Sequence, residues 1–232
     1  MEIKKGVLYG VSVGPGDPEL LTVKAVRVLE RCGVIAAPRT RSGGTLALDI
    51  VRRAVSLEGK TVLPLFFSMG RDREAWRESH RQAAAEIQAC LDQGRDVAMP
   101  NLGDVSIYST FGYLMELLRE KGYEAVMIPG VPSFCAAAAR LGVSLCSGDA
   151  PLHIVPVSGQ NPEPALDWPG AKVLMKAGGS LPGVTEALRK SGQLDRAALV
   201  EDCGLPTERV CADLTENVEK TGYFATVIVK EQ

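Results

Sequence analysis

Five short apolar runs rich in β-branched residues recur through the first half of this chain, and segments with helical spacing lie between them. Their apolar residues do not alternate with polar ones, which is typical of strands that are covered on both faces of a parallel sheet. The runs are VLYGVSV (7–13), VIAA (34–37), TVLPLF (61–66), DVAMP (96–100) and EAVMIP (124–129). The helical segments are 18–31, 45–57, 74–93 and 107–121. This alternation predicts a βα-repeating, mostly parallel α/β domain.

The second half has a different texture. Short apolar runs separated by Pro, Gly and Asp follow an Ala-rich segment at 133–142, and they predict a mixed, partly antiparallel sheet. The runs lie at 152–157, 172–176, 196–201, 209–214 and 224–230. We therefore expect an N-terminal α/β domain over 1–122 and a C-terminal mixed-sheet α/β domain over 123–232.

Composition excludes several classes of function. The 232 residues carry 26 basic and 28 acidic side chains, a net charge of −2 that argues against general binding to nucleic acid. The six cysteines include no C-x-x-C pair, and the two histidines, His80 and His153, lie far apart, so we expect no metal site. No apolar run reaches the length of a membrane span and the N-terminus lacks a signal-peptide pattern, so we expect a cytoplasmic protein without membrane contact.

A glycine-rich turn, GPGDP (14–18), follows the first strand. Pro15 removes a backbone donor from it, and the turn matches neither the dinucleotide pattern nor the P-loop pattern, both of which bind phosphate through N–H groups. Asp17 before Pro18 is also typical of a helix cap, so a purely structural turn remains an alternative. If the turn binds a ligand, that ligand lacks phosphate.

Two further turns of this kind follow later strands, in MPNLGDVSIYST (99–110) and IPGVPSFCAAAARLG (128–142). Open α/β sheets bind ligands beyond the carboxyl ends of their strands, so three such turns indicate one binding crevice. Asp104 alone is compatible with either a helix cap or a ligand contact. Small residues after the third turn allow close approach of the backbone to a helix or a ligand.

The ordered segments GVSVGPGDPELLTVKAVRVL, NLGDVSIYSTFGYL, MIPGVPSFCAAAARLG, VLMKAG and YFATVIV resemble the successive motifs of the tetrapyrrole methylases. Further segments, GTLALDIV (44–51) and FFSMGRD (66–72), resemble the members that methylate C20 of precorrin-2 or cobalt-factor II in cobalamin biosynthesis. The resemblance covers nearly the whole chain. It implies a two-domain α/β enzyme with its active site in the cleft between the domains, usually a homodimer, that uses S-adenosylmethionine.

Matching positions imply the cofactor contacts. Two positions depart from the family pattern: Val105 replaces a usual Pro, and Pro132 replaces a residue with a hydroxyl, which Ser133 could supply instead. Asp104 would accept from a ribose hydroxyl or from the amino group of the cofactor. The full implied set is Pro15, Leu102, Gly103, Asp104, Ile107, Pro132, Ser133, Lys176, Cys203 and Thr226.

The implied substrate carries many carboxylates, which an acidic protein can attract only through local Arg and Lys. Arg39 and Arg41 follow the second strand and are our candidates for binding it, whereas the second basic run, at 68–81, is equally typical of a solvated helix face. Tyr108 is a weak candidate for a catalytic residue, and simple packing is the alternative. The sequence does not distinguish a metal-free from a cobalt-containing substrate.

Two other functions remain open at this point. One is methylation of a different macrocycle carbon, and the other is a non-catalytic ligand-binding module that retains the fold. The intact Gly-Asp and Pro-Gly turns favour an enzyme, because a disused cofactor site would lose them first.

Overall fold

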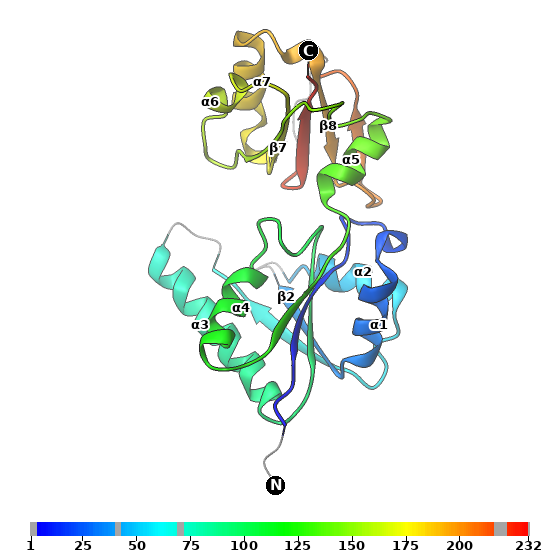
Figure 1. Ribbon diagram of the computed structural model, residues 1–232, viewed down its shortest axis with the longest axis vertical. Helices are drawn as coiled ribbons and strands as arrows, with labels where there is room; N and C mark the ends of the chain where they lie inside the picture. Colours follow the sequence, from blue (N-terminus) through cyan, green and yellow to red (C-terminus); the bar gives the residue numbers. More distant parts are fainter. Residues whose placement is uncertain (1–3, 40–42, 69–71, 216–221, 232) are drawn as a thin grey trace. The chain divides into compact units, whose positions relative to one another are not determined.

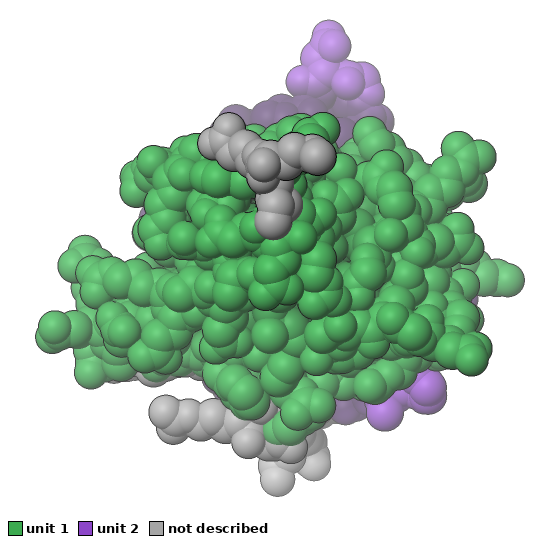
Figure 2. Space-filling model, turned by 90° about the horizontal axis from the view of Figure 1, so that it is seen from below, with its two compact units in different colours: residues 1–132 green, residues 133–232 purple. Residues whose placement is uncertain are grey.

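The computed structural model describes residues 4–39, 43–68, 72–215 and 222–231, which fall into two compact units (Figure 1). Unit 1 is Met1–Pro132 and unit 2 is Ser133–Gln232; Figure 2 colours them separately. The boundary between the units thus follows Pro132, whereas the sequence suggested a boundary after residue 122. The reason is that the strand β5 (Ala125–Ile128) pairs with β1 (Leu8–Ser12) and so completes the first sheet.

Unit 1 contains a five-stranded sheet in the order β3-β2-β4-β1-β5, in which every pair is parallel. The remaining strands are β2 (Val34–Arg39), β3 (Thr61–Phe66) and β4 (Val97–Asn101). All five strands coincide with the apolar runs of the sequence, so the expected parallel α/β architecture is confirmed.

Four helices connect these strands: α1 (Val23–Arg31), α2 (Leu46–Ala54), α3 (Arg73–Leu91) and α4 (Phe111–Glu120). Before α1, Asp17 caps a short 3₁₀ helix, Pro18–Leu20, by accepting from the Glu19 N–H at 2.9 Å, and Thr22 caps α1 itself. The expected helix over 18–31 is therefore two helices. The expected start of α4 at residue 107 is wrong, because Tyr108 has a left-handed φ of 50° that a helix does not admit.

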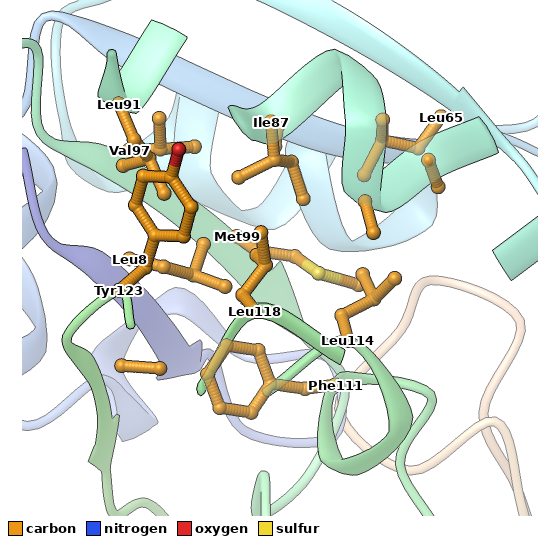
Figure 3. Packing of buried hydrophobic residues seen from close by; sticks show 14 of the residues in the cluster. Leu8, Leu65, Ile87, Leu91, Val97, Met99, Phe111, Leu114, Leu118 and Tyr123 are labelled. Carbon is orange, nitrogen blue, oxygen red and sulfur yellow. The ribbon is translucent and has the colours of Figure 1, made fainter. Parts of the chain in front are cut away.

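The sheet of unit 1 is buried on both faces, and its side chains alternate between two apolar clusters. Val34 and Ala36 of β2 pack with α3 and α4, whereas Ile35 and Ala37 pack with α1 and α2. Figure 3 shows the first cluster, in which Ile87 of α3 and side chains of α4 point toward the strands. This two-sided burial explains why the strand sequences read as continuous apolar runs.

The pairing of β2 with β4 ends early. It includes Val34 and Ile35, whereas β2 pairs with β3 as far as Arg39. The Val97 N–H donates to the Val7 carbonyl on the β1 side, so alternate residues of β4, including Pro100, face β2. Likewise, the Gly33 carbonyl accepts from the Thr61 N–H of β3. Backbone groups alternate along β2, so those of Pro38 face β4. Continuing the ladder would require N–H groups from both prolines, and proline has none.

Unit 2 contains a second five-stranded sheet, in the order β6-β7-β10-β8-β9. The pair β6 and β7 is parallel and the other pairs are antiparallel, so the expected mixed sheet is confirmed. Its strands are β6 (Leu152–Pro156), β7 (Ala171–Met175), β8 (Ala197–Glu201), β9 (Arg209–Cys211) and β10 (Ala225–Val229).

Helices cover both faces of the second sheet. The helices α6 (Glu163–Leu166) and α7 (Leu181–Lys190) pack on one face around a cluster that includes Leu174, Leu199 and Val227. The helix α5 (Ser133–Leu141) contacts β8 and β10 and lies on the other side of the sheet (Figure 1). Within the described residues, no helix combines the length and the apolar composition that crossing a membrane requires.

Candidate functional site

Three loops of unit 1 follow the carboxyl ends of the neighbouring strands β4, β1 and β5. Gly14, after β1, and Gly103, after β4, form an isolated bridge in which the Gly103 N–H donates to the Gly14 carbonyl at 2.8 Å. The chain then leads from β1 to α1 on one face of the sheet and from β4 to α4 on the other. The bridge therefore lies at a switch point, where open α/β sheets bind their ligands.

Asp104 joins the second of these loops to the third. Its Oδ1 accepts from the Ser106 N–H at 2.9 Å, and its Oδ2 accepts from the Gly130 N–H, after β5, at 2.8 Å. The side chain is buried, with a relative exposure of 9%. Asp104 is not a helix cap, because α4 begins at Phe111, seven positions later in the chain. Both of its oxygens already hold the loops in place.

The first loop joins this arrangement through Ser12, the last residue of β1. The Ser12 Oγ accepts from the Val105 N–H at 2.8 Å, and Ser12 is fully buried. A Cβ on Gly130 would lie 2.4 Å from the Ser12 Cβ, a distance that real structures do not show. Glycine at 130 is therefore required for the third loop to approach the first. Gly130, Ser12 and Asp104 thus belong to one hydrogen-bonded network that joins the three turns.

The charge of Asp104 is stabilised within this network. Burial alone would raise the pKa of the carboxyl, but hydrogen bonds from Ser106, Gly130 and Ser12 outweigh it and lower the pKa below its ordinary value. The side chain is therefore an anion at neutral pH.

The other residues of unit 1 that the resemblance implied lie on or beside these loops. Pro15, Leu102, Ile107 and Pro132 are half-buried. The Ile107 N–H donates to the Asp104 carbonyl at 3.1 Å, so Ile107 belongs to the same turn. Ser133 follows Pro132 directly as the first residue of α5, and is also half-buried.

In unit 2, the strand pairing brings Lys176, Cys203 and Thr226 to one end of the sheet. Thr226 at the start of β10 pairs with Met175 on one side and Val200 on the other. Lys176 follows Met175 directly, and Cys203 follows the end of β8. Because β10 is antiparallel to both neighbours, its first residues lie beside the last residues of β7 and β8.

Among the residues that the structure describes, three other than glycine have a left-handed backbone; two of them lie in motifs that carry the family resemblance, and the third directly precedes Cys203. They are Tyr108 (φ 50°), Lys176 (φ 59°) and Asp202 (φ 51°). Each follows the end of a strand, β4, β7 or β8. Such a conformation costs a residue with a Cβ on the order of 1–2 kcal/mol, and such residues concentrate at functional sites.

Burial shifts the ionisation of two candidate residues in unit 2. It lowers the pKa of Lys176. It also raises the pKa of the Cys203 thiol to about 11, with Glu208 acting in the same direction and Arg140 opposing it. Cys203 is therefore a protonated thiol at neutral pH, which suits packing against a ligand and does not suit nucleophilic attack.

The loop after β8 that carries Cys203 is fixed by Glu208. Its carboxylate accepts from the Gly204 N–H at 2.7 Å and from the guanidinium of Arg140 on α5. The sequence interpretation did not include Glu208, Ser12 and Ser106, and it included Gly130 only as part of the third turn. Of these residues, Gly130 was visible as the glycine of a Pro-Gly turn, and Ser12 as a polar residue near the end of an apolar strand.

Of the two arginines expected to bind the substrate, Arg39 is the exposed last residue of β2. Arg41 lies outside the described residues. Tyr108, the catalytic candidate, is 47% exposed in the loop between β4 and α4.

The residues present fit a ligand such as S-adenosylmethionine, which has no phosphate. Gly14, Gly103 and Gly130 leave the three turns without side chains where a Cβ would obstruct approach to the backbone. Pro15 and Pro132 remove N–H donors from the same turns, so carbonyl oxygens predominate, and these suit a cation such as a sulfonium. Among the described residues, no three His, Cys, Asp or Glu side chains come together as a metal site.

Unit 1 is a parallel α/β unit with glycine turns at a switch point, and a mixed-sheet unit follows it, an arrangement typical of α/β proteins that bind a small ligand at their strand ends. A family model, that of the tetrapyrrole (corrin/porphyrin) methylases, matches residues 7–219. The chain belongs to this family. It is 32% identical to the cobalt-precorrin-2 C(20)-methyltransferase of Salmonella typhimurium over 98% of this chain and 97% of that one. It is 31% identical to a precorrin-2 C(20)-methyltransferase of Sinorhizobium sp over 97% of this chain and 95% of that one.

Solved structures have the same fold. The cobalt precorrin-4 methyltransferase aligns with a TM-score of 0.74 at 20% identity, covering 97% of this chain and 94% of that one. The uroporphyrin-III C-methyltransferase of Thermus thermophilus, solved with S-adenosyl homocysteine, aligns with a TM-score of 0.70 at 24% identity, covering 96% of this chain and 97% of that one. The expected family and fold are thus confirmed.

Proposed function

We propose that this chain transfers a methyl group from S-adenosylmethionine to C20 of precorrin-2 or cobalt-factor II, a step of cobalamin biosynthesis. The observation that carries the proposal is the similarity, over nearly the full length of each chain, to two relatives named for C20 methylation. The hydrogen-bonded network that joins the three turns of unit 1 supports it, because it holds the backbone of those turns in position at the switch point where a cofactor would bind.

The residues of unit 1 would bind the cofactor mainly through their backbone. The side chain of Asp104 already accepts from Ser106 and Gly130, so its principal role in this proposal is to hold Gly103 and Ile107 in position. The half-buried side chains of Leu102 and Ile107 offer apolar contact, and Pro15, Pro132 and Ser133 complete this part of the site.

In unit 2, Lys176, Cys203 and Thr226 are proposed as further contacts of the cofactor. The strand pairing places Lys176 beside Thr226, and of these three side chains only that of Lys176 is cationic, which a carboxylate complements. We therefore assign Lys176 to a carboxylate group of the ligand.

S-adenosylmethionine supplies a methyl group that is already activated by a sulfonium, so the protein has to align the reacting atoms and exclude water. Formation of the new carbon–carbon bond leaves C20 with one proton to lose. Tyr108 is our candidate for relaying that proton: its exposed phenol oxygen would accept it while the phenol's own proton passes to water, and its left-handed backbone lies in the loop that follows the Gly103 turn.

Arg39, and Arg41 with it, would bind peripheral carboxylates of the tetrapyrrole. Replacing both by Gln should raise the Michaelis constant for the tetrapyrrole about ten-fold, or ~1.4 kcal/mol, and leave the affinity for S-adenosyl homocysteine unchanged. Loss of cofactor affinity with tetrapyrrole binding intact would assign this segment to the cofactor instead.

A homodimer and a cytoplasmic location are also part of the proposal. A monomeric mass at micromolar concentration would contradict the homodimer.

The proposal is tested by incubating the protein separately with precorrin-2 and with cobalt-factor II, using S-adenosylmethionine labelled with ¹³C in its methyl group. We expect one substrate to gain the mass of one methyl group, with the carbon resonance of a methyl on C20. A methyl group on another carbon would support the rival reading of a different tetrapyrrole methylase. Failure to bind either S-adenosylmethionine or S-adenosyl homocysteine in a calorimetric titration would favour a non-catalytic module.

A further inference from the structure

Phe66, the last residue of β3, has a large apolar side chain in an unusual place. It is 58% exposed, although the other strand residues of this sheet are mostly buried. It lies at the carboxyl end of the sheet, the edge that also carries the Gly14 and Gly103 turns. An exposed phenyl ring in a chain with only 5% aromatic residues calls for a physical account.

The neighbour of Phe66 on the adjacent strand is Arg39. The two residues are Cα partners in the parallel pair of β2 and β3, and both are exposed. Side chains alternate along both strands: Ile35 and Ala37 of β2 and Val62 of β3 pack on the face of α1 and α2. Continuing that alternation places Arg39 and Phe66 on the same face, about 5 Å apart at their Cα atoms.

The ends of β2 and β3 that carry this pair extend beyond the point where β2 stops pairing with β4. Pro38 and Pro100 face each other's strand without N–H groups, and the pairing of β2 with β4 accordingly ends after Ile35. Four residue pairs, from Ala36 and Leu63 to Arg39 and Phe66, continue as a two-stranded ribbon. Within the described residues, none of the ion pairs includes Arg39.

We propose that Phe66 is a substrate-binding residue, whose ring stacks on the macrocycle of a tetrapyrrole while the adjacent Arg39 guanidinium binds a carboxylate at its periphery. This inference rests on the proposed function. A flat, unsaturated ring system bordered by carboxylates is complementary to a phenyl ring beside a guanidinium. β3 lies two strands from β4, about 10 Å at the usual spacing, so a macrocycle on Phe66 extends toward the turn at Gly103.

The test compares Phe66→Leu with Phe66→Tyr. Leucine keeps apolar bulk and loses the aromatic plane, whereas tyrosine keeps the plane. Because Phe66 is largely exposed, neither change should alter the melting temperature. We expect Phe66→Leu to raise the Michaelis constant for the tetrapyrrole about ten-fold and leave kcat and the affinity for S-adenosyl homocysteine unchanged. Phe66→Tyr should behave as the wild type.

A matched control is Trp168→Leu in unit 2, which removes another aromatic side chain, 46% exposed, and should leave the Michaelis constant unchanged. An unchanged Michaelis constant in Phe66→Leu, or equal loss in the leucine and tyrosine variants, would overturn the inference. So would a change in the oligomeric mass of Phe66→Leu, which would assign the ring to contact between copies. Wild-type protein that methylates neither tetrapyrrole defeats the proposed function instead, so the two failures are distinguishable.

Discussion

The two units end the strands of their candidate sites in different ways. In unit 1, the first left-handed residues after β1 and β4 are glycines, Gly14 (φ 70°) and Gly103 (φ 66°), and Tyr108 (φ 50°) follows only later in the second loop. In unit 2, the equivalent turns after β7 and β8 are made by Lys176 (φ 59°) and Asp202 (φ 51°). Glycine adopts this conformation without strain, and other residues do not.

This difference indicates which part of each turn matters. At a glycine turn only the backbone can contact a ligand, and in unit 1 the surrounding side chains of Ser12 and Asp104 serve to fix that backbone. A strained lysine persists only where its surroundings hold it, and its side chain is then available for a role. We conclude that the glycine turns of unit 1 would present main chain to the cofactor, whereas the turn at Lys176 in unit 2 would present a side chain.

The comparison predicts the largest effect for Asp104→Ala. The change leaves the N–H groups of the exposed Ser106 and the half-buried Gly130 without their charged acceptor, and a hydrogen bond to a charged group contributes about 1.5–3 kcal/mol. We expect the free energy of unfolding, measured with urea, to fall by about 3 kcal/mol, and affinity for S-adenosyl homocysteine to fall as well. Full stability with reduced affinity would show instead that Asp104 contacts the cofactor directly and does not hold the loops.

A somewhat smaller effect is expected for Gly130→Ala. The new Cβ would lie 2.4 Å from the Ser12 Cβ, so the third loop must move, at a typical overpacking cost of about 2 kcal/mol. The matched control is Gly112→Ala in α4, where no atom lies within 4 Å of the added Cβ and alanine favours the helix. Urea titration of both variants measures the difference. Equal stability in the two would mean that the approach of Gly130 to Ser12 has no energetic importance.

The sequence predicted unit 1 better than unit 2 for a physical reason. Glycine turns after apolar strands are visible in the sequence, and so are the residues Gly103 and Asp104 within them. The hydrogen-bonded network itself was not visible, because the bonds from the Val105 N–H to Ser12 and from the Gly130 N–H to Asp104 join residues that are 93 and 26 positions apart.

In unit 2, no local pattern places Lys176 beside Thr226, since their proximity depends on the antiparallel register of β7 and β10. The resemblance supplied those residues, and the topology then brought them together. The early end of the pairing between β2 and β4 could be explained only once the facing directions of Pro38 and Pro100 were known.

The acid dependence of stability offers a third test. The folded state lowers the pKa of Asp104, so its contribution to stability is complete above the unfolded-state pKa, about 4, and is lost as the pH falls through the folded-state value. The stability difference between wild type and Asp104→Asn should therefore be largest above about pH 4 and narrow below it. Urea titrations across this range measure it. If the difference in free energy of unfolding did not change with pH, the charge of Asp104 would not be stabilised by the hydrogen-bonded network.

The smallest expected effect concerns the strained turn of unit 2. Replacing a residue in an ordinary conformation by glycine lowers stability relative to alanine, because glycine loses more entropy on folding. At Lys176 the order should be reversed, since alanine keeps a Cβ in the left-handed conformation and glycine does not. We expect Lys176→Gly to exceed Lys176→Ala in free energy of unfolding by about 1 kcal/mol.

Both variants should lose affinity for S-adenosyl homocysteine to the same extent, because both lack the ammonium group that we assign to a carboxylate. If the glycine variant alone kept wild-type affinity, the turn of unit 2 would act through its backbone, as the turns of unit 1 do, and the distinction between the two units would fail.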